Sequence, residues 1–235
     1  MARSLGNCVL TLVVGLSLAG MTGCAGTGAS KAWSAWPFNE KTTDVVPGVP
    51  SPAERIALLR QVAKKSATAS ADEQERVSRE LADVYRQEDD PLIRAEITRA
   101  LAGYKTEAAA SVLRTAMNDA NTDVRIAACK AWGRRRDEEA VSQLSRVLGS
   151  DVDVDVRLTA AEALGETGNR AAVTALGQVL NDRDPAMQYR AVASLRKVGE
   201  QDFGNDVERW RAYVKGETPG PEKPVSVVER FRRMF

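Results

Sequence analysis

A short pattern of residues returns every 31 or 32 positions through the middle of this chain of 235 residues, and it constrains the fold more than any other feature of the sequence. An apolar residue stands before a long polar one in four copies: Ile93-Arg94, Val124-Arg125, Val156-Arg157 and Met187-Gln188. Three and seven residues after the long polar residue, each copy has another apolar side chain. This spacing places the apolar residues on one face of a helix.

A second apolar pattern follows each copy and predicts a second helix, so that each unit is a pair of helices. Its members recur in register as Leu113, Leu144 and Leu176, each followed four residues later by Met117, Leu148 and Leu180. Asp90-Pro91 and Asp184-Pro185 predict an N-cap with proline at the first helical position. A glycine stands near the end of each first helix, where we expect a positive φ to close the turn: Gly103, Gly133, Gly165 and Gly199.

An acid six residues before the long polar residue completes the pattern, which resembles HEAT repeats of the short HEAT-like type described in phycobilisome lyases. The resemblance covers residues 88 to about 200 and implies a ladder of acids and arginines through the stack. Gln188 departs from this column, so we expect the last interface to be looser or differently satisfied. The ladder residues are Glu88, Asp119, Asp151 and Asp182 on the acidic side and Arg94, Arg125 and Arg157 on the basic side.

Weaker copies flank the clear ones, at residues 53–86 and 205–214, as is usual for the ends of a repeat array. Counting them, we expect an all-α protein: an α-solenoid of about five HEAT-like helix pairs over residues 53–214. Gly216 and three prolines predict a linker over residues 215–224. Residues 225–235 predict a short amphipathic helix whose apolar stripe includes Phe231 and Phe235. This helix caps the solenoid, binds a partner groove or contacts an anionic bilayer.

Residues 1–23 have the anatomy of a signal peptide, with one cation at Arg3 and an apolar run of about a dozen residues, too short for a spanning helix. The sequence Met21-Thr22-Gly23-Cys24 resembles the lipobox of bacterial lipoproteins. The resemblance implies acyl chains on Cys24 and a location in the cell envelope. Because Ala25 rather than an aspartate follows the cysteine, it favours the outer membrane over the inner one.

The Gly-, Ser-, Thr- and Pro-rich residues 24–52 predict a flexible tether between that anchor and the repeats. Trp33, Trp36 and Phe38 interrupt it. They contact the bilayer interface, pack loosely on the folded part or form a docking motif.

Catalytic and metal chemistry have little support in the sequence. The chain contains no histidine, so the iron-dependent hydroxylase activity of some HEAT-like proteins lacks its ligands. Asp151, Asp153 and Asp155 alternate in one loop and suggest weak Ca²⁺ binding, but helix-cap and ladder roles explain them better. Cys129 falls in a core column and no histidine is available to activate it. We therefore expect no enzyme, cofactor or metal.

Charge also argues against a nucleic-acid partner, because the chain without its signal peptide is formally neutral. The basic run Arg134-Arg135-Arg136 is followed directly by three acids, which predicts a solvated loop. We expect Trp132 in the core, and Trp210 with Tyr213 buried under the C-terminal tail.

These features together predict a monomeric, lipid-anchored scaffold that binds another envelope protein. We expect the second helices to line the inner face of the stack, with partner contacts at Gln143, Arg146, Thr174 and Gln178. Two other functions remain open: an accessory lyase-like or ligand-binding HEAT protein, and a purely structural envelope spacer.

Overall fold

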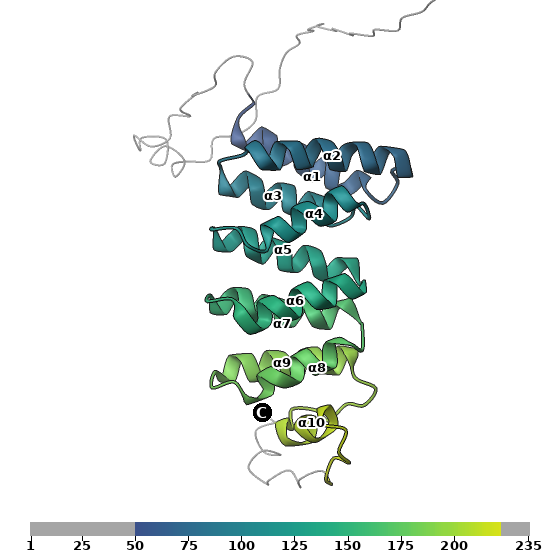
Figure 1. The fold of residues 1–235 in the computed structure, drawn as a ribbon, viewed down its shortest axis with the longest axis vertical. Coiled ribbons are helices and arrows are strands. Elements are labelled where there is room, and N and C mark those ends of the chain that lie inside the picture. The colour runs from purple at the N-terminus through teal and green to yellow at the C-terminus, as the bar shows by residue number, and fades with distance from the viewer. Residues whose placement is uncertain (1–49, 222–235) are drawn as a thin grey trace, which may run out of the picture. The chain divides into compact units, whose positions relative to one another are not determined.

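The computed structural model describes residues 50–221, and within that range every regular element is helical. In chain order the helices are α1 (Pro52–Lys65), α2 (Ala71–Gln87), α3 (Pro91–Leu101), α4 (Glu107–Ala116), α5 (Thr122–Arg135), α6 (Glu138–Ser150), α7 (Val154–Thr167), α8 (Ala172–Gln178), the 3-10 helix η2 (Val179–Asn181), α9 (Pro185–Val198) and α10 (Val207–Val214). Figure 1 shows them stacked in this order. The predicted α-solenoid is confirmed.

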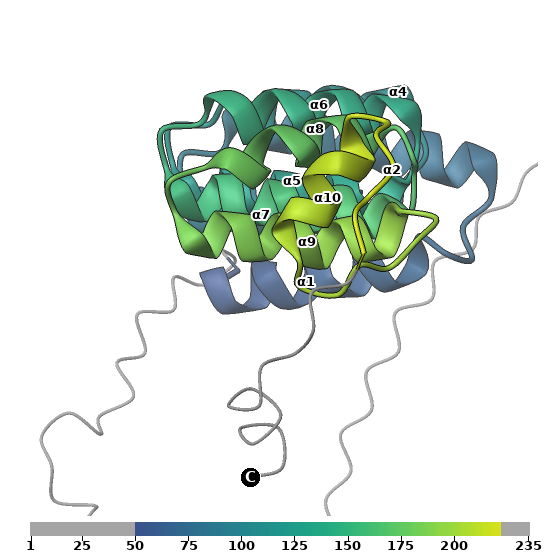
Figure 2. The same ribbon diagram turned by 90° about the horizontal axis from the view of Figure 1, so that it is seen from below.

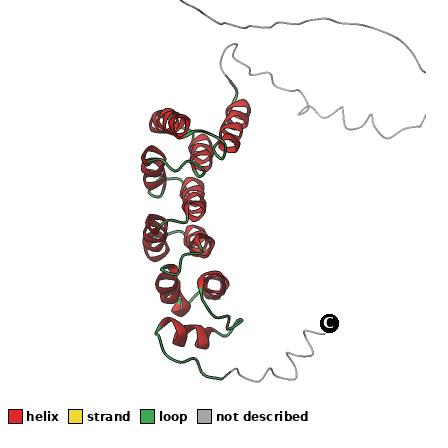
Figure 3. Ribbon diagram, turned by 90° about the vertical axis from the view of Figure 1, so that its right-hand side faces the viewer, coloured by secondary structure: helices red, strands yellow, loops and turns green. Residues whose placement is uncertain are grey.

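The helices form two layers. Figure 3 shows the first helices of the pairs (α1, α3, α5, α7 and α9) in one column and the second helices (α2, α4, α6 and α8) in the other. The last helix, α10, lies across α8 and α9 and closes the lower end, as Figure 2 shows from below. With α10 counted as the partner of α9, residues 50–221 contain five helix pairs.

Side-chain caps set the starts of most helices. Asp90 and Asp184 each accept a hydrogen bond of 2.8 Å from the backbone N–H two residues later, with proline directly after the cap, as their sequences predict. At the first helix, Ser51 and Glu54 form a reciprocal capping box around Pro52. Helix α1 thus begins one residue before the predicted boundary, because proline suits the first helical position.

The core follows the repeat columns. All side chains of the two apolar columns on the first helices are buried, and so are the leucine and methionine columns of the second helices. Trp132 occupies a leucine position of this core and is fully buried, as predicted, while Arg135 lies over its ring with the guanidinium carbon 5.2 Å from the centroid. Continuous burial of this kind joins neighbouring repeats into one stack.

The prediction for the four glycines is wrong, since none of them has a positive φ. Helices α5 and α7 continue past Gly133 and Gly165, and the left-handed residues are Arg136 and Gly168, three positions further on. Gly165 has a different purpose: a Cβ there would lie 2.8 Å from the Cβ of Ser194 on α9. These glycines let the backbones of neighbouring first helices approach closely.

The close approach of the first helices also bends the stack. In Figure 3 the second helices are spread more widely along the stack than the first helices, so the first-helix layer forms the inner side. The expectation that the second helices line the inner face is therefore wrong. Its physical cause is the column of Gly, Ala and Ser side chains between first helices, which shortens that side of the stack.

An aromatic cluster completes the C-terminal end. Trp210 is fully buried, packs edge-on against Phe203 with ring centroids 5.0 Å apart, and donates from Nε1 to the carbonyl oxygen of Gly204 at 3.0 Å. Tyr213 lies 5.7 Å from Trp210, centroid to centroid. The predicted burial of Trp210 is confirmed, but Phe203 in the loop before α10 provides part of the cover. The C-terminal tail beyond residue 221 lies outside the described residues.

Candidate interaction surface

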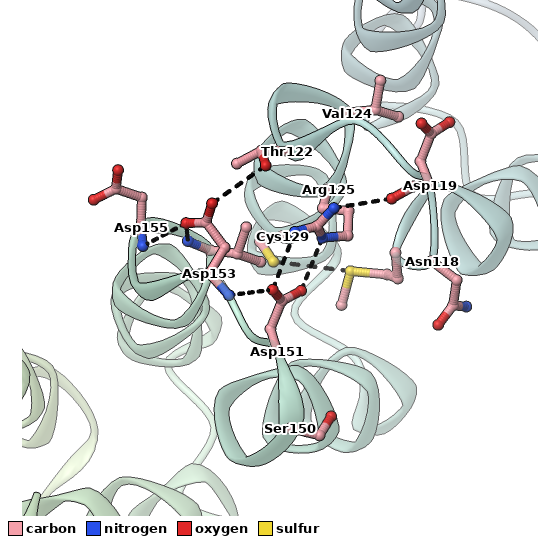
Figure 4. A network of polar contacts seen from close by, with 12 residues as sticks. Asn118, Asp119, Thr122, Val124, Arg125, Cys129, Ser150, Asp151, Asp153 and Asp155 are labelled. Atoms are coloured by element: carbon pink, nitrogen blue, oxygen red, sulfur yellow. Dashed lines mark hydrogen bonds and ion pairs between the residues drawn. The ribbon is translucent and has the colours of Figure 1, made fainter.

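Ion pairs link each repeat to the next along one edge of the stack. Arg94 bonds both oxygens of Asp119, at 2.8 and 2.9 Å, and Arg125 bonds both oxygens of Asp151, at 2.9 and 3.1 Å. Arg157 bonds Asp182 at 2.5 Å. Each arginine belongs to a first helix and each acid to the loop before the following first helix, so the pairs cross the repeat boundaries. Figure 4 shows the pair of Arg125 and Asp151.

The partly buried carboxylate of Asp119 shows how such a pair affects ionisation. Burial opposes its charged form, but hydrogen bonds from Arg94 and from the backbone N–H of Asn121 outweigh burial and lower its pKa. Tyr85 also donates to this carboxylate, at 3.2 Å. In turn, burial and the Asp119 charge raise the pKa of Tyr85. The ion pair of Arg94 and Asp119 therefore stays ionised at neutral pH and links the two repeats.

The ladder starts one repeat earlier than the sequence pattern indicates and stops at Gln188. Arg55 of α1 pairs with Glu88, a contact that the periodicity misses because Arg55 lies 39 residues before Arg94. Gln188 donates from Nε2 to the carbonyl oxygen of Asp182 at 2.7 Å. Arg125 makes the same type of contact with Asp119 within its own repeat. Gln188 thus keeps the local bond and makes no ion pair to a following repeat.

The aspartates suggested for Ca²⁺ are held by other partners. The carboxylate of Asp151 bonds Arg125, and that of Asp153 caps α7 and accepts a hydrogen bond from Thr122 at 3.2 Å (Figure 4). Asp155 is exposed in the first turn of α7. Within residues 50–221, no group of three or more potential ligand side chains could hold a metal ion. The ladder accounts for Asp151 and helix capping for Asp153, and Asp155 is an exposed acid in the first turn of α7.

The thiol of Cys129 is buried in the core, with its Sγ 3.9 Å from the Sδ of Met117. Burial raises the pKa of this thiol to about 12, and the nearby Asp151 charge adds to the shift. A thiol in this environment is uncharged at neutral pH and a poor nucleophile.

The structure places the four predicted contacts on the second helices, in the outer layer. Arg146 and Gln178 are exposed and Gln143 is half-buried. Thr174 lines a groove of about 640 Å³ between α8, α10 and the segment after α10. Arg146 bonds the side chain of Asn118 at 3.3 Å. These residues do not converge on one site.

Exposed apolar side chains gather instead on the first-helix side. Among the described residues, large apolar side chains are exposed at Leu58, Val84, Leu92, Val152, Val154 and Tyr189. All but Val84 belong to first helices or to a loop that leads into one. Tyr189 is the most exposed of those within a helix, at 65 %. Sequence reasoning missed these positions because it assigned apolar columns to the core, although Tyr189 stands in register with Ile126 and Leu158 of the preceding repeats.

Three of the predicted site residues lie outside the described residues: Cys24, Phe231 and Phe235. The same holds for Trp33, Trp36 and Phe38 of the tether, for the whole of the predicted signal peptide and C-terminal helix, and for the tether up to residue 49. Among residues 50–221, no helix combines the length and apolar character that a bilayer span requires.

Comparison with known families gives one result. The model for HEAT repeats matches residues 78–157 and 148–210, more than half of the chain. No curated protein matches the chain. The matched range runs from α2 to α10 and includes the Arg94, Arg125 and Arg157 pairs. The chain therefore belongs to the HEAT-repeat family.

Proposed function

We propose that this chain is a lipid-anchored scaffold of the cell envelope, which binds another protein through the face formed by its first helices. The lipobox-like sequence ending at Cys24 supports the anchor. The HEAT-repeat stack supports the scaffold, because helix-pair solenoids present extended surfaces suited to protein partners.

The exposed apolar side chains of the first helices are the reason for assigning the partner to this face. Tyr189 follows Gln188 as Leu158 follows Arg157, and as Ile126 follows Arg125. Ile126 and Leu158 are half-buried, and Tyr189 is mostly exposed. With Leu92 they give consecutive first helices an apolar side chain on their accessible side. Single exposed apolar residues are ordinary on a protein surface, but a series over adjacent elements is typical of an interaction site.

Ion pairs between neighbouring first helices hold this face in a defined shape. Glu96 of α3 accepts bonds from Arg60 of α1 at 3.3 Å and from Arg99 of its own helix at 3.1 Å. Further down, Arg190 of α9 bonds Glu162 of α7 at 3.2 Å. A partner would therefore meet a surface whose side chains are already ordered, which lowers the entropic cost of binding.

Capture from detergent-solubilised membranes tests the scaffold. The full chain should retain a protein in stoichiometric amount, and the Leu92→Asp/Tyr189→Asp variant should lose it, because charges in an apolar contact cannot be desolvated cheaply. The matched control is Arg146→Glu/Gln178→Glu on the second helices. Loss with the control alone would move the contact to the second helices. Failure of the wild-type chain to retain any protein would contradict the scaffold.

The anchor has a separate test. Cells that express the chain are grown with a labelled fatty acid, and we expect the label on the wild-type chain and none on Cys24→Ala. Equal labelling of both, or no label on either, would contradict acylation at Cys24.

A further inference from the structure

A second groove lies where the first helices of three successive pairs end. It has a volume of about 470 Å³ and is formed by the last turns of α5, α7 and α9. Its lining is unusual for this formally near-neutral chain, since it holds three cations against one carboxylate. The lining residues are Gly133, Arg134, Arg136, Gly165, Glu166, Gly168 and Lys197.

The three cations are exposed and have no ion-pair partner within residues 50–221. Their direct neighbours behave differently: Arg135 pairs with Asp137 at 3.0 Å and Arg196 with Asp202 at 2.9 Å. The groove therefore concentrates arginine and lysine side chains that the fold does not neutralise.

The acids that follow the basic run in sequence are used elsewhere. Asp137 caps α6 by accepting a hydrogen bond from Ala140 N–H at 2.8 Å, in addition to its bond with Arg135. Glu139 bonds Arg114 of α4 at 2.5 Å. The basic run was predicted to be a solvated loop, and Arg134 and Arg136 are exposed, although Arg134 belongs to the last turn of α5. Neither of them pairs with Asp137 or Glu139.

Arg134 and Lys197 lie in the last turns of α5 and α9, where the helix dipole favours cations, but hydrogen bonds to the end carbonyls of α5 do not account for Arg134 and Arg136. The carbonyl oxygen of Arg135, at the end of this helix, already accepts a bond from Nζ of Lys105 at 2.7 Å. Arg134 and Arg136 make no hydrogen bond to a helix-end carbonyl within the described part of the chain.

Arg136 also occupies a backbone conformation that its side chain disfavours. Its φ is 59° and its ψ is 21°, and it is the one non-glycine residue of positive φ between residues 50 and 221. The equivalent residue of the next repeat is Gly168, with a φ of 64°. Glycine adopts this conformation without strain, whereas an arginine there is kept at a cost. Strain of this kind is concentrated at functional sites.

We propose that this groove binds a phosphate group, with Arg134, Arg136 and Lys197 as the ligating side chains. Guanidinium groups match phosphate oxygens in pairs and stay charged at every physiological pH, and lysine adds a point charge. The phosphate belongs either to a soluble phosphate compound or to a phospholipid headgroup. The site is separate from the apolar first-helix residues of the proposed partner surface, so it stands or falls independently of that function.

Calorimetric titration of the full chain, purified in a neutral detergent, tests this site with two probes. Pyrophosphate represents a soluble phosphate, and glycerophosphoglycerol represents a lipid headgroup. We expect binding that weakens with added salt, and an affinity about tenfold lower for Arg134→Gln/Lys197→Gln. Binding of pyrophosphate alone would identify a soluble ligand, and comparable binding of glycerophosphoglycerol a headgroup; either supports the site.

Two further variants separate the groove from general charge effects. Arg183→Gln removes an exposed cation, which has no ion-pair partner among residues 50–221, from the loop between η2 and α9, and it should bind both probes as the wild type does. Arg136→Gly should weaken binding without lowering the unfolding temperature, because the backbone there suits glycine. Failure of the wild type to bind either probe, or an equal loss of affinity in Arg183→Gln, would overturn the proposal.

Discussion

Replacement of Gly165 by alanine should destabilise the stack, although alanine is the better helix former. The new Cβ on α7 would lie 2.8 Å from the Cβ of Ser194 and 2.9 Å from its Cα and Oγ. Because the Cα belongs to the backbone of α9, relief requires the two helices to move apart. Overpacking of this kind costs about 3 kcal/mol at its upper end, and alanine returns about 1 kcal/mol through helix propensity. We expect a net loss of about 2 kcal/mol in the free energy of unfolding.

The same substitution at Gly149 is the matched control. Gly149 lies in α6, and a Cβ there would meet no atom within 4 Å. Only helix propensity then acts, so we expect Gly149→Ala to gain up to about 1 kcal/mol. Two identical changes in neighbouring helices should therefore have opposite signs.

Urea unfolding followed by circular dichroism measures both changes. The second-site variant Ser194→Gly removes two of the three close contacts, those with Cβ and Oγ, and leaves the one with Cα. Gly165→Ala/Ser194→Gly should therefore lose less than the sum of its two single changes. If Gly165→Ala is as stable as the wild type, or if the double variant shows no such coupling, the close approach of α7 and α9 does not limit this position and the reasoning fails.

Three further perturbations test the ladder and the core. Arg125→Gln should lower the free energy of unfolding, measured in urea, by about 2 kcal/mol. This is less than the roughly 3–5 kcal/mol for breaking a fully buried pair, because the side chains of Arg125 and Asp151 are 13 % and 8 % exposed. An unchanged free energy of unfolding would contradict a stabilising pair. The lowered pKa of Asp119 means that its stabilising contribution is present above its ordinary pKa of 3.8 and is lost as the pH falls through the folded value. Thermal unfolding should therefore show a smaller loss below about pH 4 in Asp119→Asn than in the wild type. Cys129 should react with a thiol reagent at neutral pH no faster than the chain unfolds, with Cys129→Ala as the blank; faster labelling would refute its burial.

The repeat fold could be read from the sequence because each copy carries the same information at the same position. An arginine such as Arg94 stands after a buried apolar residue, and its acid lies 25 or 26 residues further on in each of the three pairs. The sequence pattern therefore coincides with the contacts. Periodicity does not identify Arg55, because it lies 39 residues before Arg94 and the other steps of the column are 31 or 32 residues. A fixed repeat length identifies the residues of a column, but it misses an end repeat whose spacing to the next repeat is different.

The glycines were misread for a different physical reason. A glycine near a predicted helix end is a good C-cap candidate, yet Gly133 and Gly165 serve helix-to-helix contact, which depends on the distance to the next repeat. The residue with the left-handed backbone conformation is Arg136, and arginine seldom adopts this conformation. The direction of bend was beyond the sequence too, because it results from the difference in spacing between the two layers.

Helix α1 has no fully buried residue, whereas α3 buries seven. Partly buried apolar side chains of α1 pack against the core, and ion pairs join Arg60 to Glu96 of α3 and Arg55 to Glu88 in the loop before α3. A pulling force applied at the N-terminal side of the stack would therefore act first on a helix that has no fully buried residue. Release of the 14 residues of α1 as extended chain would add about 25 Å of length. The remaining repeats would stay folded during this step, so unfolding of α1 would lengthen the chain before force acts on the rest of the stack.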